Sequence, residues 1–336
     1  MKHGAEPRSG PAGHRPARFF RRIGAAGALA VLLLPAASPA QTLPGEDEIL
    51  REFMWDRLSA TGPSGRPSVG LALSGGGARG FAHTGVLETL GYAGFPVDSV
   101  AGTSMGSVIG ALYASGMGVP EIWKFADRTR AMKLSRDFRG VKFLGLLLAD
   151  KLITPTYIDQ FIDDNLGALS FDGLRVPFAC VALDFRTGER MILRDGPLGA
   201  AVRASVNLPG VFAPFKYRHR YLVDGGVVDF IPVDAVRMLG ADWVLASVTS
   251  GSSDELPGNV LESLLRAIDI QGHLLAEKSE KGADFVISPP VGGIKMTDFE
   301  ECAAAGEAGL TEASRRVDRA REAYLVFSAR RMLEGL

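Results

Sequence analysis

The sequence predicts an α/β fold built around a mainly parallel sheet, and two observations carry this prediction. Short, continuous apolar runs recur along the chain, as buried parallel strands require. Segments with apolar residues at helical spacing follow the first of these runs, across short connections rich in glycine. With 336 residues, 46% of them hydrophobic, the chain has enough apolar material for one large α/β domain.

The individual elements are expected in alternating order. The predicted strands are "SVGLALSGGG" (68–77), "PVDSVAGTS" (96–104), "VPFACVALDF" (176–185) and "ADWVLASV" (241–248). The predicted helices are "RGFAHTGVLETLGYAG" (79–94) and "MGSVIGALYASG" (105–116). Each of the first two strands is directly followed by a helix, which is the unit of a parallel sheet.

The first forty residues predict a signal peptide. Six basic residues precede the apolar run Ile23–Ala37, and small residues follow it up to Ala40. The run is shorter than the about 20 residues that a membrane span needs. We therefore expect residues 1–40 to direct export, with cleavage after Ala40 and a periplasmic or secreted product; the alternative is an uncleaved inner-membrane anchor.

Residues 41–66 are polar and interrupted by proline and glycine, so a leader or linker is expected there, with a short helix near Asp47–Leu58. The folded domain is expected over 67–336. Within it, Val141–Leu152 is strongly apolar and predicts either a lid over a lipid site or a core helix. The C-terminal stretch 313–336 predicts a basic amphipathic helix, which either contacts a membrane or packs on the domain with a solvated outer face.

Charge and cysteine content narrow the function classes. Lysine and arginine number 37 against 38 acidic residues, a balance that argues against a nucleic-acid-binding protein. Two cysteines, Cys180 and Cys302, are too few for a disulfide framework or a zinc site, and each is expected to be buried as a small apolar residue. No cluster of metal-ligating residues is apparent, so neither a metal nor another cofactor is expected.

The glycine loop "SGGGARG" (74–80) joins the first predicted strand to the first helix. It matches the dinucleotide pattern at Gly75, Gly77 and Gly80. A dinucleotide site also needs an acidic residue at the end of the next strand, whereas Asp98 lies at the start of that strand. Convergent backbone amides in such a loop can instead bind an anion or a reaction oxyanion. A tight turn for close packing is the simpler alternative.

The stretch "GTSMG" (102–106) has the pattern of a nucleophile elbow, with Ser104 between Gly102 and Gly106. A serine nucleophile needs a base, and the five histidines offer none in a suitable setting. His3 and His14 lie in the predicted signal peptide; His83 is expected to be packed or capping, and His219 and His273 to be at the surface.

Asp224 is the alternative base. In "RYLVDGGVVDFIPV" it ends a short apolar run and directly precedes Gly225 and Gly226. Functional sites of parallel sheets gather at the carboxyl ends of strands. A carboxylate there can accept the proton of Ser104 directly if the two lie within about 3 Å. Capping of a turn is the alternative role for this residue.

Together with "RASVNLPGVFAPF" (203–215), the motifs "SGGGARG", "GTSMG" and "DGG" resemble, in this order, the patatin-like phospholipase family over roughly 67–232. The resemblance implies a three-layer α/β sandwich and a serine acyl hydrolase without a catalytic histidine. Within this family, the chain is most similar to bacterial, exported members, but without the outer-membrane barrel that some of them carry. The alternative class is a non-catalytic α/β protein that binds a nucleotide or another anion at the glycine loop.

By position, the resemblance implies that Ser104 is the nucleophile and Asp224 the base. The amides of Gly75, Gly76 and Gly77 would form the oxyanion hole, and Arg79 would fix the loop or bind a substrate phosphate. Supporting motif glycines are Gly80, Gly102, Gly106, Gly225 and Gly226. The implied partner is a lipid or other acyl ester, hydrolysed without a metal, with possible peripheral membrane contact.

Overall fold

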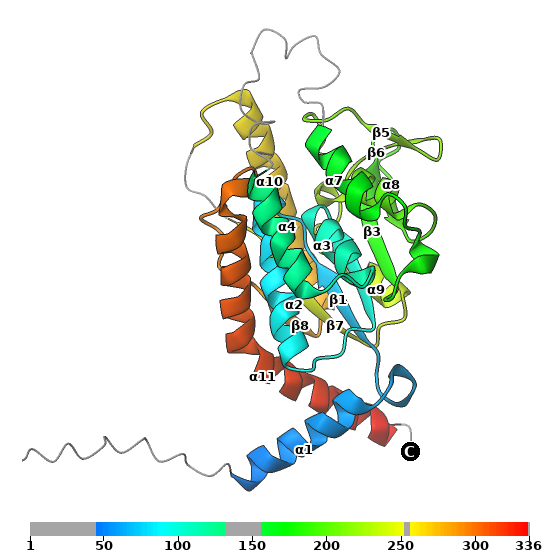
Figure 1. The fold of residues 1–336 in the computed structure, drawn as a ribbon, viewed down its shortest axis with the longest axis vertical. Helices are drawn as coiled ribbons and strands as arrows, with labels where there is room; N and C mark the ends of the chain where they lie inside the picture. The colour runs from blue at the N-terminus through cyan, green and yellow to red at the C-terminus, as the bar shows by residue number, and fades with distance from the viewer. Residues whose placement is uncertain (1–44, 132–155, 252–255, 335–336) are drawn as a thin grey trace, which may run out of the picture. The chain divides into compact units, whose positions relative to one another are not determined.

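The computed structural model describes residues 45–131, 156–251 and 256–334, and the chain from Glu46 onward forms one compact unit (Figure 1). The helices are α1 (Glu46–Ala60), α2 (Ala82–Tyr92), α3 (Met105–Ala114), α4 (Val119–Ala131), α7 (Thr156–Leu166), α8 (Leu198–Ser205), α9 (Val233–Met238), α10 (Val260–Ser279) and α11 (Cys302–Glu334). The strands are β1 (Val69–Leu73), β2 (Ser99–Thr103), β3 (Phe178–Asp184), β4 (Arg190–Leu193), β5 (Phe215–Tyr217), β6 (Arg220–Asp224), β7 (Trp243–Ser247) and β8 (Phe285–Ile287).

Within the described ranges, eight strands form one sheet in the order β5-β6-β3-β2-β1-β7-β8, with β4 paired to β3. The five strands β3, β2, β1, β7 and β8 run parallel, whereas β4 and β6 pair antiparallel with β3, and β5 pairs antiparallel with β6. The predicted α/β class with a mainly parallel sheet is therefore confirmed. All four strands and both helices expected from the sequence are present, with slightly shorter bounds.

The two faces of the sheet bury side chains of different size. Leucines of β1 join the larger core beneath α2 and α3, where Leu71 and Leu73 lie among buried apolar residues. The alternate positions of the parallel strands carry alanines, such as Ala72 and Ala101, and these face α9 and α10. Because a strand alternates its side chains between faces, the small side allows α9 to pack closely on the sheet. The result is the expected three-layer sandwich (Figure 1).

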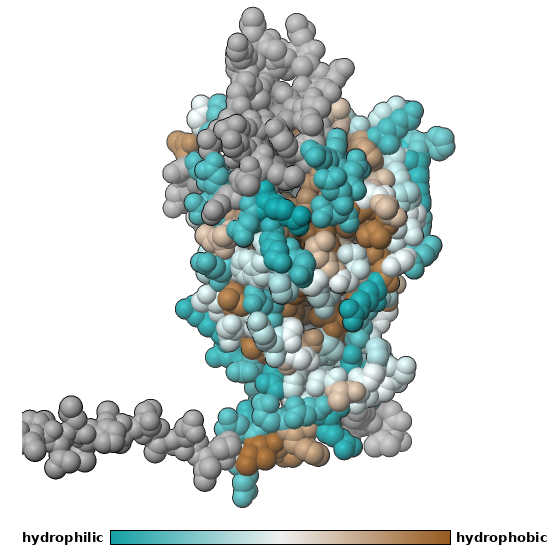
Figure 2. Space-filling view, in the orientation of Figure 1, coloured by the Kyte–Doolittle hydropathy of each residue, from teal (hydrophilic) through white to brown (hydrophobic). Residues whose placement is uncertain are grey.

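The edge of the sheet where the parallel strands begin is closed by α1 and α11. Trp55 of α1 is 3% exposed and packs with Phe95, Trp243 and Tyr324 in an aromatic cluster whose ring centroids lie 5.2–6.4 Å apart. The helix expected near 47–58 is thus present as α1, and it packs on the domain. Its outer side exposes apolar residues such as Phe53, and Figure 2 shows apolar surface at the end of the molecule where α1 lies.

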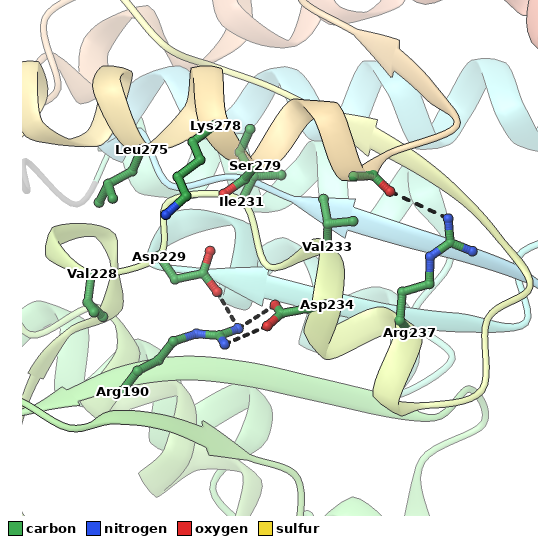
Figure 3. Close-up of a pocket in the computed structure, with 11 residues that line it drawn as sticks. Arg190, Val228, Asp229, Ile231, Val233, Asp234, Arg237, Leu275, Lys278 and Ser279 are labelled. Atoms are coloured by element: carbon green, nitrogen blue, oxygen red, sulfur yellow. Dashed lines mark hydrogen bonds and ion pairs between the residues drawn. The ribbon is translucent and has the colours of Figure 1, made fainter.

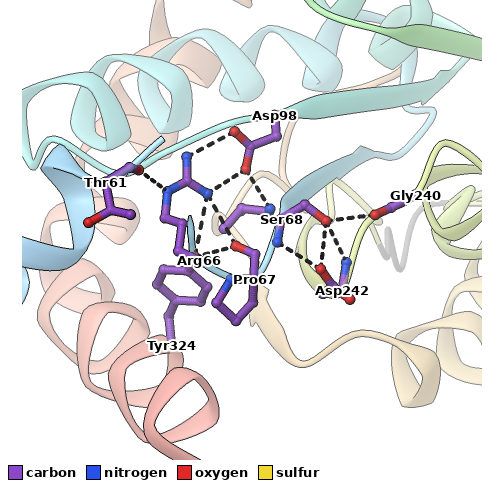
Figure 4. A network of polar contacts seen from close by, with 9 residues as sticks. Thr61, Arg66, Pro67, Ser68, Asp98, Gly240, Asp242 and Tyr324 are labelled. Carbon is purple, nitrogen blue, oxygen red and sulfur yellow. Dashed lines mark hydrogen bonds and ion pairs between the residues drawn. The ribbon is translucent and has the colours of Figure 1, made fainter. Parts of the chain in front are cut away.

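A network of polar contacts lies at the same edge of the sheet (Figure 4). Asp98 receives two hydrogen bonds from the Arg66 guanidinium, at 2.6 and 2.9 Å, and a third from the Val69 amide at 2.7 Å. Arg66 also donates to the Thr61 carbonyl, and the Tyr324 hydroxyl donates to the Pro67 carbonyl. Asp98 is thus committed to structure at the start of β2, far along the strand from the glycine loop.

The predicted C-terminal helix is present as part of α11, and one side of it is buried on the domain through residues such as Ala313, Ala320 and Tyr324. In the parts of the chain that the structure describes, no helix combines the length and the apolar character needed to cross a membrane. The predicted signal peptide 1–40 and the apolar segment Val141–Leu152 lie outside the described residues.

Candidate active site

Ser104 lies on a sharp turn between β2 and α3. Its backbone has φ 52° and ψ −124°, a conformation that non-glycine residues rarely adopt and that costs about 1–3 kcal/mol. The turn is closed so tightly that a Cβ atom on Gly102 would lie 2.3 Å from the carbonyl oxygen of Gly106. On Gly106, a Cβ would lie 2.4 Å from the Leu73 carbonyl oxygen. The structure therefore has the sharp strand-to-helix turn, with Ser104 at its apex, that the sequence pattern predicts.

The strand register brings Asp224 to Ser104. Asp224 ends β6 opposite Ala182 of β3, and Ser104 follows Thr103, which pairs with Val181 on the other side of β3. The Ser104 hydroxyl donates to Asp224 Oδ2 at 2.6 Å, and the Gly226 amide donates to Oδ1 at 2.7 Å. The two residues that the sequence predicts as nucleophile and base are thus in direct contact.

The environment of Asp224 makes it a stronger base than an ordinary aspartate. Asp224 is 2% exposed, and it forms no ion pair with any described residue. Burial raises the pKa of Asp224 from 3.8 to about 6, while hydrogen bonds from Ser104 and the Gly226 amide oppose this rise. At neutral pH the carboxylate is therefore largely ionised and still able to accept a proton.

The glycine loop lies against the nucleophile, since a Cβ on Gly75 would be 3.4 Å from the Ser104 Cβ. The Gly75 amide, however, donates to the Phe230 carbonyl at 3.0 Å. Gly76 and Gly77 have φ 149° and 58°, and their amides donate to no acceptor in the described part of the chain. Of the three predicted oxyanion donors, the structure leaves Gly76 and Gly77 available, whereas Gly75 is engaged.

Arg79 is 2% exposed and forms an ion pair with Asp269 of α10. Its guanidinium fills the space beside Gly251, where a Cβ would collide with Nη1. Two roles were expected for Arg79, fixing the loop and binding a substrate phosphate. The burial and the ion pair favour the first, because the guanidinium ties the glycine loop to α10.

The three histidines in the described residues make no hydrogen bond to the dyad. His83 is fully buried, with Nδ1 2.8 Å from the Ser247 hydroxyl and Nε2 2.9 Å from the Ser74 carbonyl oxygen. Burial lowers the pKa of His83 to about 4, against the effect of the Ser74 contact, so the ring is neutral and packed as expected. His219 and His273 are exposed. No described histidine hydrogen-bonds to Ser104 or Asp224.

A pocket of about 400 Å³ lies beside the loop that follows Asp224 (Figure 3). Asp229 lines it and shares the Arg190 guanidinium with Asp234. Burial raises the pKa of Asp229 to about 6, and the charge of Arg190 opposes this. The Asp229 carbonyl accepts a hydrogen bond from Thr103, the residue before the nucleophile. Neither Ser104 nor Asp224 lines this pocket, and its charged groups largely compensate one another.

The sequence reasoning missed two buried residues that contact the dyad. The Ser205 hydroxyl accepts from the Ser104 amide, and the Asn207 carbonyl accepts from the Asp224 amide. Both lie in the block 203–215, which the resemblance identified without giving its residues a role. The available signal was polar residues in an otherwise small or apolar stretch. In the described ranges, no group of three or more potential metal ligands occurs.

Comparisons with known proteins identify relatives of this chain. The profile of the Patatin-like phospholipase family matches residues 71–237, which include the glycine loop, Ser104 and Asp224. An uncharacterized NTE family protein of Mycobacterium bovis is 34% identical over 193 residues, 56% of this chain and 51% of that protein. Neuropathy target esterase sws of Drosophila melanogaster is 35% identical over 195 residues, 56% of this chain and 13% of that protein.

The chain thus spans about half the length, or less, of these curated relatives. Among solved structures, VipD from Legionella pneumophila aligns with a TM-score of 0.47 and 15% identity, covering 76% of this chain and 67% of that one. The family profile and the similar NTE family proteins lead to one conclusion: through residues 71–237, the chain belongs to the patatin-like phospholipase family.

Proposed function

We propose that this protein is a serine lipid acyl hydrolase of the phospholipase A or lysophospholipase type, with Ser104 and Asp224 as a catalytic dyad. The observation that carries the proposal is the 2.6 Å hydrogen bond from a strained serine to a buried aspartate. Membership of the patatin-like phospholipase family supports the hydrolysis of lipid esters. The free amides of Gly76 and Gly77 beside the serine supply the remaining component of acyl transfer.

In the acylation step, Asp224 accepts the hydroxyl proton while Ser104 Oγ bonds to the ester carbonyl carbon. The carbonyl oxygen becomes an oxyanion, which the Gly76 and Gly77 amides stabilise; such donors typically contribute about 3 kcal/mol each. The C–O bond to the alcohol then breaks. The leaving alcohol or lysolipid takes the proton from Asp224, and an acyl-serine remains.

Deacylation repeats these roles with water. Asp224 accepts a proton from a water molecule, whose oxygen attacks the acyl carbon, and the same amides stabilise the second oxyanion. When the intermediate collapses, the fatty acid leaves and Ser104 Oγ takes the proton back from Asp224. Each proton transfer uses a group of this chain, which supports the expectation of a metal-independent reaction.

The test is hydrolysis of a soluble acyl ester and of a phospholipid by the wild type, Ser104→Ala and Asp224→Asn, with a chelator present. Ser99→Ala is the matched control, because Ser99 is also buried but its hydroxyl has no hydrogen-bond partner among the described residues. We expect activity in the wild type and the control only. Activity independent of Ser104 would reject the dyad, and a protein inactive on every ester would return the glycine loop to an anion-binding role.

We also propose that the protein is exported, on the basis of the sequence of residues 1–40. Fractionation of bacterial cells that express the full chain, followed by N-terminal sequencing, tests this. A periplasmic or secreted product that begins at Gln41 is expected; an intact N-terminus in the membrane fraction would support the anchor instead.

A further inference from the structure

We infer that Ser205 and Asn207 are positioning residues that together set the geometry between nucleophile and base. Each holds the backbone amide of one member of the dyad: Ser205 that of Ser104 and Asn207 that of Asp224. The inference rests on the proposed function, since it describes how the same two catalytic groups are held. It assigns a role to a block of the sequence that the mechanism itself does not use.

Ser205 ends α8 and is fully buried. Its hydroxyl accepts a hydrogen bond from the Ser104 amide at 3.0 Å and donates to the Val181 carbonyl of β3 at 2.7 Å. The positive φ of Ser104 aims its N–H at this hydroxyl. Without Ser205 Oγ, the Ser104 amide would be buried without an acceptor at the turn that carries the nucleophile, which disfavours this geometry.

Asn207 holds the other member through its backbone. Its carbonyl accepts from the Asp224 amide at 2.9 Å, and its side chain fixes the position of that carbonyl. The side-chain amide donates to the carbonyls of Ala213 and Leu222, at 2.9 and 3.2 Å, while Oδ1 accepts from Arg203 at 2.7 Å. Asn207 is fully buried, so these contacts are not exchanged with water.

Arg203 anchors this short segment to its surroundings. It forms an ion pair with Asp159 of α7, and its guanidinium lies 5.5 Å from the ring centroids of both Phe212 and Phe215. Ser205 and Asn207 are only two residues apart, so they move as one piece with Arg203. The segment 203–207 therefore fixes Ser104 and Asp224 relative to one another as well as to the sheet.

Loss of this positioning has a distinct kinetic signature. A misplacement of about 1 Å at a reacting group can lower the rate by about 100-fold. Among the described residues, the pKa of Asp224 responds to burial, to Ser104 and to the Gly226 amide, and to no charged side chain. Since the Ser104 hydrogen bond lowers that pKa, its weakening moves the acid limb of the rate profile to higher pH. Substrate binding is unaffected.

The experiment compares Ser205→Ala with Ser205→Thr, which retains the hydroxyl, and with Ser99→Ala as the buried-serine control. For each full-length variant, we would measure thermal unfolding, the labelling rate of Ser104 by a fluorophosphonate, and kcat and KM from pH 5 to 9. Ser205→Ala is expected to lower kcat and labelling roughly 10- to 100-fold with KM nearly unchanged, and to raise the pH of the acid limb. Ser205→Thr should recover most of the rate.

Asn207→Ala removes the side-chain contacts that hold the Asn207 carbonyl against the Asp224 amide, so it disturbs the same dyad at Asp224. This variant tests the inference if Ser205→Ala does not fold. The same signature is expected. Wild-type kcat and an unmoved acid limb in folded Ser205→Ala and Asn207→Ala would overturn the inference, as would losses that only follow the fraction of folded protein. If the wild type itself neither hydrolyses esters nor reacts with the fluorophosphonate, the proposed function has failed instead.

Discussion

The carboxylates at the two ends of β2 have contrasting surroundings. At its start, Asp98 is saturated by the Arg66 guanidinium and the Val69 amide. At its other end, Ser104 meets Asp224, which is buried and whose carboxylate, among the described residues, accepts hydrogen bonds from that serine and the Gly226 amide alone. One strand of five residues thus separates a carboxylate that stabilises the fold from the one that we propose as the catalytic base.

Asp242, like Asp98, lies at the edge of the sheet where the parallel strands begin, which we call the structural edge. Burial acts to raise its pKa, but hydrogen bonds from Ser68 and the charges of Arg331 and Arg237 outweigh this and hold the pKa below 3.8. Asp224 lacks such cations, and its pKa rises to about 6. Asp98 and Asp242 thus each have arginine partners, whereas Asp224 has none among the described residues, and its pKa therefore lies closer to neutrality.

The largest expected effect follows Asp224→Asn. We expect kcat to fall at least about 1,000-fold, because an amide cannot accept the serine proton. Stability should change in the opposite direction. The folded pKa of about 6 exceeds the ordinary 3.8, so the wild type loses stability as pH rises through this interval, by about 3 kcal/mol at pH 8 and roughly half of that at pH 5. Asn removes this loss.

Urea unfolding of both proteins at pH 5 and pH 8 measures the effect. The variant should be the more stable protein, by a margin that grows with pH. A variant that is less stable than the wild type at pH 8 would show that the buried charge is better compensated than the geometry indicates.

Asp98→Ala should have the reverse effect. It leaves the Arg66 side chain, 5% exposed, without its carboxylate, and breaking such a pair typically costs about 3 kcal/mol or more. The rate per active site should not change, because Asp98 lies at the far end of β2. Denaturant unfolding and active-site titration test this, with the exposed Asp172→Ala as control. A fall in kcat of the titrated enzyme would show that the two edges are coupled.

Gly77→Ala tests the opposite edge of the sheet, which carries Ser104 and Asp224, without removing a charged group. Gly77 has φ 58°, and a Cβ there would lie 2.2 Å from the Met296 carbonyl oxygen, so the loop and its free amide must shift. We expect kcat to fall about 100-fold with a smaller change in KM. Gly91→Ala in α2, where a Cβ meets no atom within 4 Å, is the control and should be active. Equal activities would remove Gly77 from the oxyanion site.

The smallest expected effect is the pH dependence of the unmodified enzyme. Because Asp224 must be ionised to accept a proton, kcat/KM should fall about tenfold for each pH unit below about 6 and level off above it. Asp98→Ala should leave this limb in place. A limb near pH 4 in the wild type would mean that Asp224 is not buried during turnover.

The sequence predicted most of the fold, because β1, β2, β3 and β7 are short apolar runs. The antiparallel strands β4 and β5 and the edge strand β8 were not predicted, since they are short and their pairing depends on neighbours far along the chain. Trp55 likewise carries no local signal that it will pack on α11.

Within the site, Ser104 and Asp224 were predictable because each lies in a local motif with strict glycine neighbours. The partners of those motifs were not. Arg79 pairs with Asp269 across 190 residues, and the Ser104 amide meets Ser205 across 101. That the Gly75 amide is engaged also depends on a distant residue, Phe230. Such contacts follow from the packing of the sheet rather than from spacing along the chain.

The aromatic cluster at the structural edge determines what intrinsic fluorescence reports. Of the three tryptophans, Trp55 and Trp243 both belong to it, and the guanidinium of Arg321 lies 4.7 Å from the Trp55 ring centroid. The signal of these two tryptophans in a thermal melt will therefore follow the detachment of α1 and α11. Local unfolding around Ser104 will not change that signal, so the edge of the sheet that carries Ser104 and Asp224 needs a separate spectroscopic reporter.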